Sequence, residues 1–131
     1  MKISTFATDL DLEENGVWVD LGDGGSILVA RWDNPHYQKF VREALRPHRA
    51  AIRKRTLSDE ISDDVVLRAY ANTILLDWKG LEDDKGKAIK YSIEAAYDLM
   101  KGMKDFKALV VEIAGEAATF RRENLEEEGN G

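Results

Sequence analysis

Residues 65–100 carry the pattern that most constrains the fold. Apolar and aromatic side chains recur there at steps of three and four, which predicts one buried helical stripe ending near Trp78. The stripe consists of Leu67, Tyr70, Ile74, Leu75 and Trp78. Gly80 follows where a helix commonly ends in a left-handed residue, residues 83–86 have turn chemistry, and Ser92 suits an N-cap. We therefore expect two helices joined by an acidic turn, with Trp78 filling the corner between them.

A β-hairpin is predicted before this stretch. Residues 17–21 alternate between apolar and other side chains, residues 22–25 read Gly-Asp-Gly-Gly, and residues 26–32 supply a return strand. Residues 1–15 show no sustained period and are expected to form a loosely ordered N-terminal arm, with a short strand near Ile3 and Phe6. The hairpin would thus be the first firmly folded element.

Helices are expected to fill most of the remaining chain. Asn34 and Pro35 predict a helix start, and Pro47 should kink or restart the helix before it continues to about residue 55. The last helix, from residue 104 or 105, has a buried stripe made of Phe106, Leu109, Val110, Ile113, Ala117 and Phe120. We predict an α+β, mostly α-helical fold, in which the N-terminal hairpin packs beside about five helices. Residues 16–122 would form a single domain, and residues 123–131 an acidic flexible tail.

Length and composition exclude several classes. A chain of 131 residues suits one domain, and the absence of cysteine excludes disulfides, thiolate metal sites and cysteine nucleophiles. The net charge of −6 disfavours non-specific nucleic-acid binding. No apolar run approaches the roughly 20 residues that cross a bilayer, and the N-terminus lacks a signal-peptide pattern, so we expect a cytoplasmic protein without membrane contacts.

No motif indicates catalysis. His36 and His48 are the only histidines, and a zinc site would need a third protein ligand at workable spacing. Residues 81–86 fail the acid alternation of a calcium loop, and residues 22–26 lack the phosphate-loop pattern. No nucleophile with a paired base and no particular pair of carboxylates stands out. We therefore expect a non-enzyme that uses no cofactor and no metal.

Two surfaces remain as candidate binding sites. Four arginines at steps of four, three and four would form one basic stripe if the helix continued across Pro47: Arg42, Arg46, Arg49 and Arg53. Such a stripe would suit an anionic partner, either nucleic acid or an acidic peptide, but a solvated face is the favoured interpretation. The second surface is apolar, because a helix layer can cover only one face of the hairpin well. Its candidate partner-binding residues are Trp18, Trp32, Leu76 and Trp78. A groove between hairpin and helices would also suit a partner helix.

The succession of motifs over about residues 16–122 resembles the tail assembly chaperones of long-tailed bacteriophages and prophages. The matching stretches follow family order: residues 18–22 through 28–31, 34–37, 45–49, 74–81, 86–92 and 106–121. One departure is Ile93, which stands where the family pattern has proline after the serine. The departure alters a helix start and leaves the fold unchanged.

The resemblance implies a small, largely helical non-enzyme that binds the tape measure protein during tail assembly. Such proteins keep apolar helical segments soluble, help to recruit tail tube subunits, act in the host cytoplasm and are absent from the mature virion. It implies no catalytic residues. Two alternatives stay open, namely a structural head–tail connector or completion protein, and a small nucleic-acid-binding regulator. Formation of a homo-oligomer is also left open.

Overall fold

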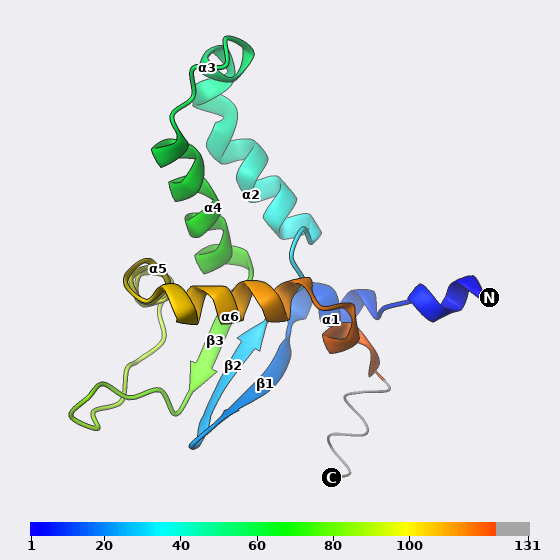
Figure 1. The fold of residues 1–131 in the computed structure, drawn as a ribbon, viewed down its shortest axis with the longest axis vertical. Coiled ribbons are helices and arrows are strands. Elements are labelled where there is room, and N and C mark those ends of the chain that lie inside the picture. The colour runs from blue at the N-terminus through cyan, green and yellow to red at the C-terminus, as the bar shows by residue number, and fades with distance from the viewer. Residues whose placement is uncertain (123–131) are drawn as a thin grey trace.

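The computed structural model describes residues 1–122 of the chain. Figure 1 shows a small sheet from which a long helical arm projects, while two further helices lie against one end of the sheet. The arm consists of α2 (Pro35–Leu45), a 3-10 turn (Arg46–His48), α3 (Arg49–Arg53) and α4 (Asp59–Thr73). The helices at the sheet are α5 (Ile93–Gly102) and α6 (Lys104–Gly115). The predicted α+β, mostly helical class is confirmed.

The sheet has three antiparallel strands, β1 (Val17–Gly22), β2 (Gly25–Val29) and β3 (Leu75–Lys79), in the order β1-β2-β3. The hairpin of β1 and β2 is as predicted, with Val19 opposite Ile27 and a turn through Asp23 and Gly24, both at positive φ. The return strand is shorter than expected, because it ends at Val29 instead of continuing to Trp32. Beyond it, the Ala30 amide donates to the Ile74 carbonyl, outside the β1–β2 ladder.

The third strand corrects the prediction of one helix up to Trp78. Helix α4 ends at Thr73, and residues 75–79 pair with β2, placing Trp78 opposite Ile27. The expected stripe is buried throughout, but Leu75 and Trp78 reach the core from a strand. A short apolar run fits either period, so pairing with an available strand decides the outcome. Gly80 accordingly follows a strand and does not end a helix.

Several helix starts lie where the sequence places them. The Asn34 side chain accepts hydrogen bonds from the amides of His36 and Tyr37, with Pro35 at the first helical position. Ser92 caps α5 through the Ala95 amide. Pro47 falls in the 3-10 turn between α2 and α3, so the helix restarts there as expected.

The main core lies between one face of the sheet and helices α4, α5 and α6. Its most deeply buried side chains include Ile27, Val29, Ile74, Leu75, Met100 and Val110. A second, smaller cluster joins Leu12, Val17 and Phe120. This cluster brings Leu12, near the start of the chain, against Phe120, near the end of the described residues.

Both ends of the described chain differ from expectation. Ile3–Phe6 is a 3-10 helix, not a strand, and residues placed in the N-terminal arm form α1 (Leu10–Asn15), whose Leu12 is buried. The last helix ends at Gly115, and Phe120 lies in a separate 3-10 helix, Ala117–Phe120. The expected continuous stripe from Phe106 to Phe120 is therefore wrong in its last part. The predicted tail, residues 123–131, lies outside the described residues.

Among the described residues, no helix has the length and apolar character needed to span a membrane.

Candidate partner-binding surface

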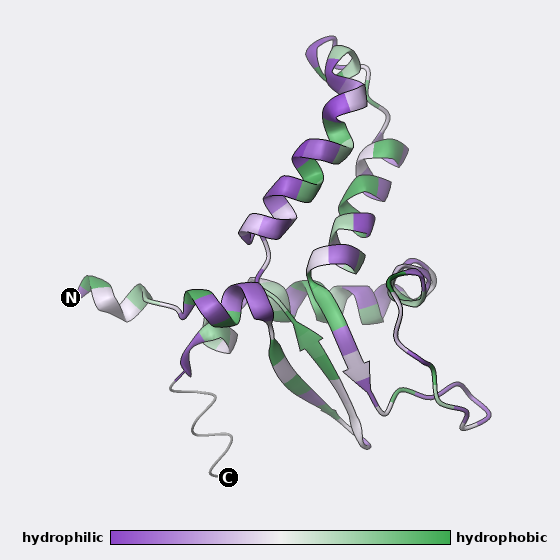
Figure 2. Cartoon of the chain, turned by 180° about the vertical axis from the view of Figure 1, so that it is seen from behind, coloured by the Kyte–Doolittle hydropathy of each residue, from purple (hydrophilic) through white to green (hydrophobic). Residues whose placement is uncertain are grey.

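The sheet has one face that packs on the helices and one that does not. Along β2, Ile27 and Val29 are fully buried, whereas Leu28 between them is only partly buried. Successive side chains of a strand point to opposite faces, so Leu28 lies on the far side of the sheet from the main core. We call this side the outer sheet face. Figure 2, the view from behind, shows no helix in front of most of the length of the strands.

Three apolar side chains from three strands gather on the outer sheet face. Trp18 of β1 stands directly opposite Leu28 of β2, which places both side chains on one face. Leu76 of β3 joins them at an irregularity in the ladder, where residues 75–77 oppose Leu28 and Val29. All three side chains are partly exposed.

Gly16 shows how closely the two leucines converge. A Cβ at this position would lie 3.0 Å from Leu28 Cδ1 and 3.2 Å from Leu76 Cδ1. Gly16 also has a φ of +90°, a conformation that side chains disfavour. The absent side chain therefore leaves room for both Leu28 and Leu76 beside the start of β1.

Charged groups border this apolar patch. The Lys79 ammonium lies 4.1 Å from the centroid of the Trp18 ring, an arrangement that stabilises by about 0.5–1 kcal/mol at exposed sites. Asp77, paired with Leu28, lies on the same face. The patch can thus bury an apolar segment while charges at its edge remain in water, as in many protein interfaces.

Trp78 is not available to a partner. Its side chain is only 5% exposed and belongs to the main core. Its indole Nε1 donates a hydrogen bond of 2.7 Å to the Ile89 carbonyl. The prediction that Trp78 is buried is therefore confirmed. It does not fill a corner between two helices, however, but lies between β3 and residues 81–91.

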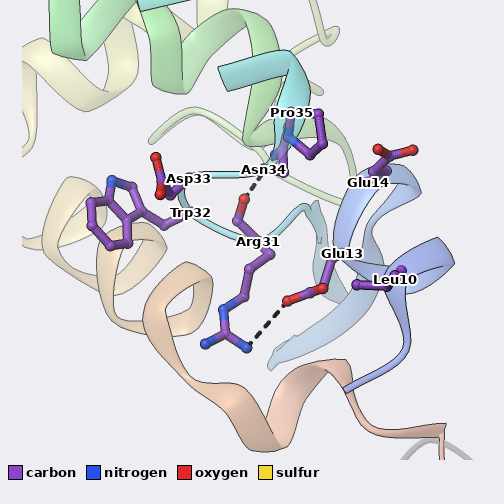
Figure 3. Close-up of a pocket in the computed structure, with 8 residues that line it drawn as sticks. All are labelled: Leu10, Glu13, Glu14, Arg31, Trp32, Asp33, Asn34 and Pro35. Atoms are coloured by element: carbon purple, nitrogen blue, oxygen red, sulfur yellow. Dashed lines mark hydrogen bonds and ion pairs between the residues drawn. The ribbon is translucent and has the colours of Figure 1, made fainter. Parts of the chain in front are cut away.

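Trp32 lies apart from Trp18. It follows β2, its amide donates to the Ala114 carbonyl of α6, and its ring meets Tyr37 of α2 edge-on at 6.4 Å. Figure 3 shows Trp32 at the rim of a hollow whose other side holds the ion pair of Arg31 with Glu13, at 3.6 Å. Although Trp32 is 49% exposed, the structure does not place it on the outer sheet face.

The four arginines are exposed, and within residues 1–122 none of them forms an ion pair or a side-chain hydrogen bond. They are divided among three segments: Arg42 in α2, Arg46 in the 3-10 turn, and Arg49 and Arg53 in α3. One stripe would require a helix that is continuous across Pro47. A 3-10 turn instead separates α2 from α3 there. The four therefore do not lie along a single helix.

Sequence reasoning missed Leu28 as a member of the apolar patch. The signal was present, because a residue directly across a hairpin from Trp18 must share its face once the turn fixes the register. Leu76 was named, but for a helix, and its place near Leu28 depends on the third strand.

Together, these features define a small α+β domain whose sheet has one partly exposed apolar face. The profile of a known family, the YdaY prophage protein, matches residues 32–130, which is most of the chain. The chain therefore belongs to the YdaY prophage protein family. Comparisons with curated proteins and with solved structures gave no match.

Proposed function

We propose that this prophage protein is a non-enzymatic tail assembly chaperone that binds the tape measure protein and helps to recruit tail tube subunits. The observation that carries the proposal is the outer sheet face, where Trp18, Leu28 and Leu76 form a partly exposed apolar patch. Membership of a prophage family agrees with a role in phage assembly. The order of sequence motifs adds the resemblance to tail chaperones.

An exposed apolar patch suits the task of keeping amphipathic helices from aggregating. A long chain of amphipathic helices aggregates through its apolar stripes until it is packed into a tail. Contact with an apolar face removes those stripes from water, at roughly 25 cal/mol for each Å² buried. Binding to the soluble form shifts the balance away from aggregation by mass action. The chain itself, with a net charge of −6, contributes repulsion between complexes.

The proposal is tested by co-expressing the tape measure protein of the same prophage with the tagged chain. We expect the tape measure protein to move into the soluble fraction and to elute with the chain. Failure of the tape measure protein to become soluble, with the chain eluting alone, would overturn the proposal.

Purified virions separate this function from that of a structural connector. We propose that the chain acts in the host cytoplasm and does not remain in the particle. Quantitative mass spectrometry of purified virions should then find tail tube protein without stoichiometric amounts of this chain. Stoichiometric presence would favour the head–tail connector or completion protein instead.

A further inference from the structure

A groove runs along the other side of the hairpin, between α6 and the β1 strand with its hairpin turn. Two adjoining hollows form it. One lies between β1 and α6, the other between the hairpin turn, residues 80–89 and the α5–α6 junction, and Leu21 lines both. We call the two together the hairpin groove. It opens on the core side of the sheet and is separate from the outer sheet face.

The groove exists because the core covers β1 at its start but leaves the strand partly exposed toward the hairpin turn. Val17, Val19 and Leu21 alternate along β1 and share a face. Val17 is only 6% exposed, but Val19 and Leu21 are partly exposed toward the hairpin turn. Figure 1 shows α6 crossing near one end of the strands, which leaves the hairpin turn beyond its reach.

The facing wall comes from the α5–α6 junction and α6. Its apolar residues recur at steps of three, three and four, so they form one stripe: Met103, Phe106, Leu109 and Ile113. Phe106, Leu109 and Ile113 are partly buried, and Met103 is 58% exposed. The floor and walls thus offer the pattern into which the apolar face of an amphipathic helix packs.

The charged side chains that line the groove are negative. The charged residues that line its described walls are all acidic: Asp20, Asp23, Glu82, Glu112 and Glu116. The lysines near the start of α6 do not offset them, since Lys104 and Lys107 line a different hollow, against α4. An apolar floor between acidic edges favours a partner segment with lysine or arginine beside its apolar stripe.

We propose that the hairpin groove binds a cationic amphipathic helix of a partner protein. The apolar stripe of that helix packs against Val19, Leu21 and the α6 stripe, while its basic residues meet Glu112 and Glu116. A helix is favoured over an added strand, because the β1 ladder is irregular between Asp20 and Gly22, and such irregularities disturb edge pairing. The inference stands on the groove alone and does not depend on the tail chaperone function.

The test uses a fluorescein-labelled peptide of lysine and leucine, about 18 residues or five helical turns long, with leucine at helical spacing. Fluorescence anisotropy measures its binding to the full chain, and circular dichroism reports the helix gained. We expect saturable binding with induced helix, weakened by added salt because the contacts are partly electrostatic. The same peptide with glutamate in place of lysine should not bind.

Matched variants locate the contact. Glu112→Lys with Glu116→Lys reverses two exposed acids of the groove, and Glu43→Lys with Asp98→Lys makes the same change in net charge at exposed positions outside it. The groove pair should weaken binding by about tenfold or more, and the control pair by no more than about twofold. Equal losses in both would mean attraction to net charge alone and would overturn the proposal.

Two single variants complete the design. Met103→Ser removes an exposed apolar contact while supplying a good N-cap for α6, which has no side-chain cap at present. It should weaken peptide binding without lowering the melting temperature. Trp18→Ala, on the outer sheet face, should leave peptide binding unchanged. Loss of binding in Trp18→Ala with retention in Met103→Ser would place the site on the outer sheet face and contradict the groove, as would failure of the lysine peptide to bind.

Discussion

Trp78 and Ile89 are joined by a hydrogen bond of 2.7 Å from the indole Nε1 to the backbone carbonyl. A second bond ties the same two segments together, since the Tyr91 hydroxyl donates to the Leu75 carbonyl at 2.7 Å. The Trp78 and Tyr91 rings also meet edge-on at 4.9 Å. Strand β3 and the segment after it are therefore held together by two hydrogen bonds and a ring contact.

Truncation of Trp78 should destabilise the fold severely. We expect Trp78→Ala to lower the free energy of unfolding by about 3–5 kcal/mol, the usual cost of emptying a buried aromatic site. Trp78→Phe keeps much of the packing but leaves the Ile89 carbonyl without its donor, which costs about 1–3 kcal/mol. Urea unfolding followed by circular dichroism measures both. An unchanged free energy of unfolding in Trp78→Ala would show that the side chain does not belong to the core.

Gly80 should tolerate no side chain. A Cβ there would lie 2.1 Å from the Gly24 carbonyl oxygen, and the residue has a φ of +70°. Because the obstacle is backbone, it cannot rotate away. Gly24 has a φ of +80°, and nothing lies within 4 Å of a Cβ added to it. Gly24→Ala therefore measures the cost of the positive φ without a steric clash.

We expect Gly80→Ala to be clearly less stable than Gly24→Ala in thermal unfolding, with Gly102→Ala close to wild type. Gly102 has ordinary φ and nothing within 4 Å of an added Cβ. Equal melting temperatures for Gly80→Ala and Gly24→Ala would show that β3 and the hairpin turn are not in contact.

Tyr70 should make the fold sensitive to alkali. Burial raises the pKa of Tyr70 from 10.0 to about 12, with a smaller contribution from Tyr37. A group whose pKa is raised by folding contributes stability that is complete below its unfolded pKa and is lost as pH rises through the folded value. The loss should fall between about pH 10 and 12. Tyr70→Phe should show a flatter dependence of unfolding free energy over this window, and an equally steep one would contradict the account.

Asp64 should lose its partners in acid. A hydrogen bond from the Tyr97 hydroxyl, followed by one from Arg68, lowers the pKa of Asp64 below its ordinary value of 3.8. This lowered pKa supports folding above the ordinary value, and the support is lost as pH falls through the folded value. The effect on stability is small because Asp64 is 38% exposed.

The direct measurement is a carboxyl NMR titration of Asp64 in wild type and Tyr97→Phe. Removing the hydroxyl should move the Asp64 pKa up toward its ordinary value, whereas Asn72→Ala, on the same helix but without contact to Asp64, should leave it unchanged. No shift in Tyr97→Phe would mean that the hydroxyl does not bind the carboxylate.

Local signals in the sequence predicted the elements whose start and end are set by neighbouring residues. The cap at Asn34 with Pro35, the cap at Ser92 and the turn through Asp23 and Gly24 depend on backbone geometry within a few residues. Whether residues 74–79 form a helix or a strand depends on pairing with β2, some 50 positions earlier in the chain. No local sequence pattern contains that information. The same holds for Phe120, whose burial depends on Leu12 and Val17.

The residues of the outer sheet face were predicted in part for the same reason. Alternation in the hairpin correctly indicated that one face would lack a helix, and Trp18 lies there. Trp32 was assigned to the hairpin because the return strand was expected to span residues 26–32, but the strand ends at Val29, and the amide of Ala30 bonds to Ile74. The hairpin groove requires knowledge of where α6 crosses the sheet, which the sequence of α6 alone does not provide.

The most direct measurement is the soluble fraction of the tape measure protein co-expressed with a variant that carries Trp18→Ser and Leu76→Ser. Trp32→Ser is the matched control, because it removes an exposed tryptophan away from the outer sheet face. Circular dichroism first verifies that both variants fold. If the outer sheet face holds the tape measure protein, the double variant leaves it insoluble, and the Trp32 variant keeps it as soluble as wild type does. A folded double variant that solubilises the tape measure protein as well as wild type would contradict the account.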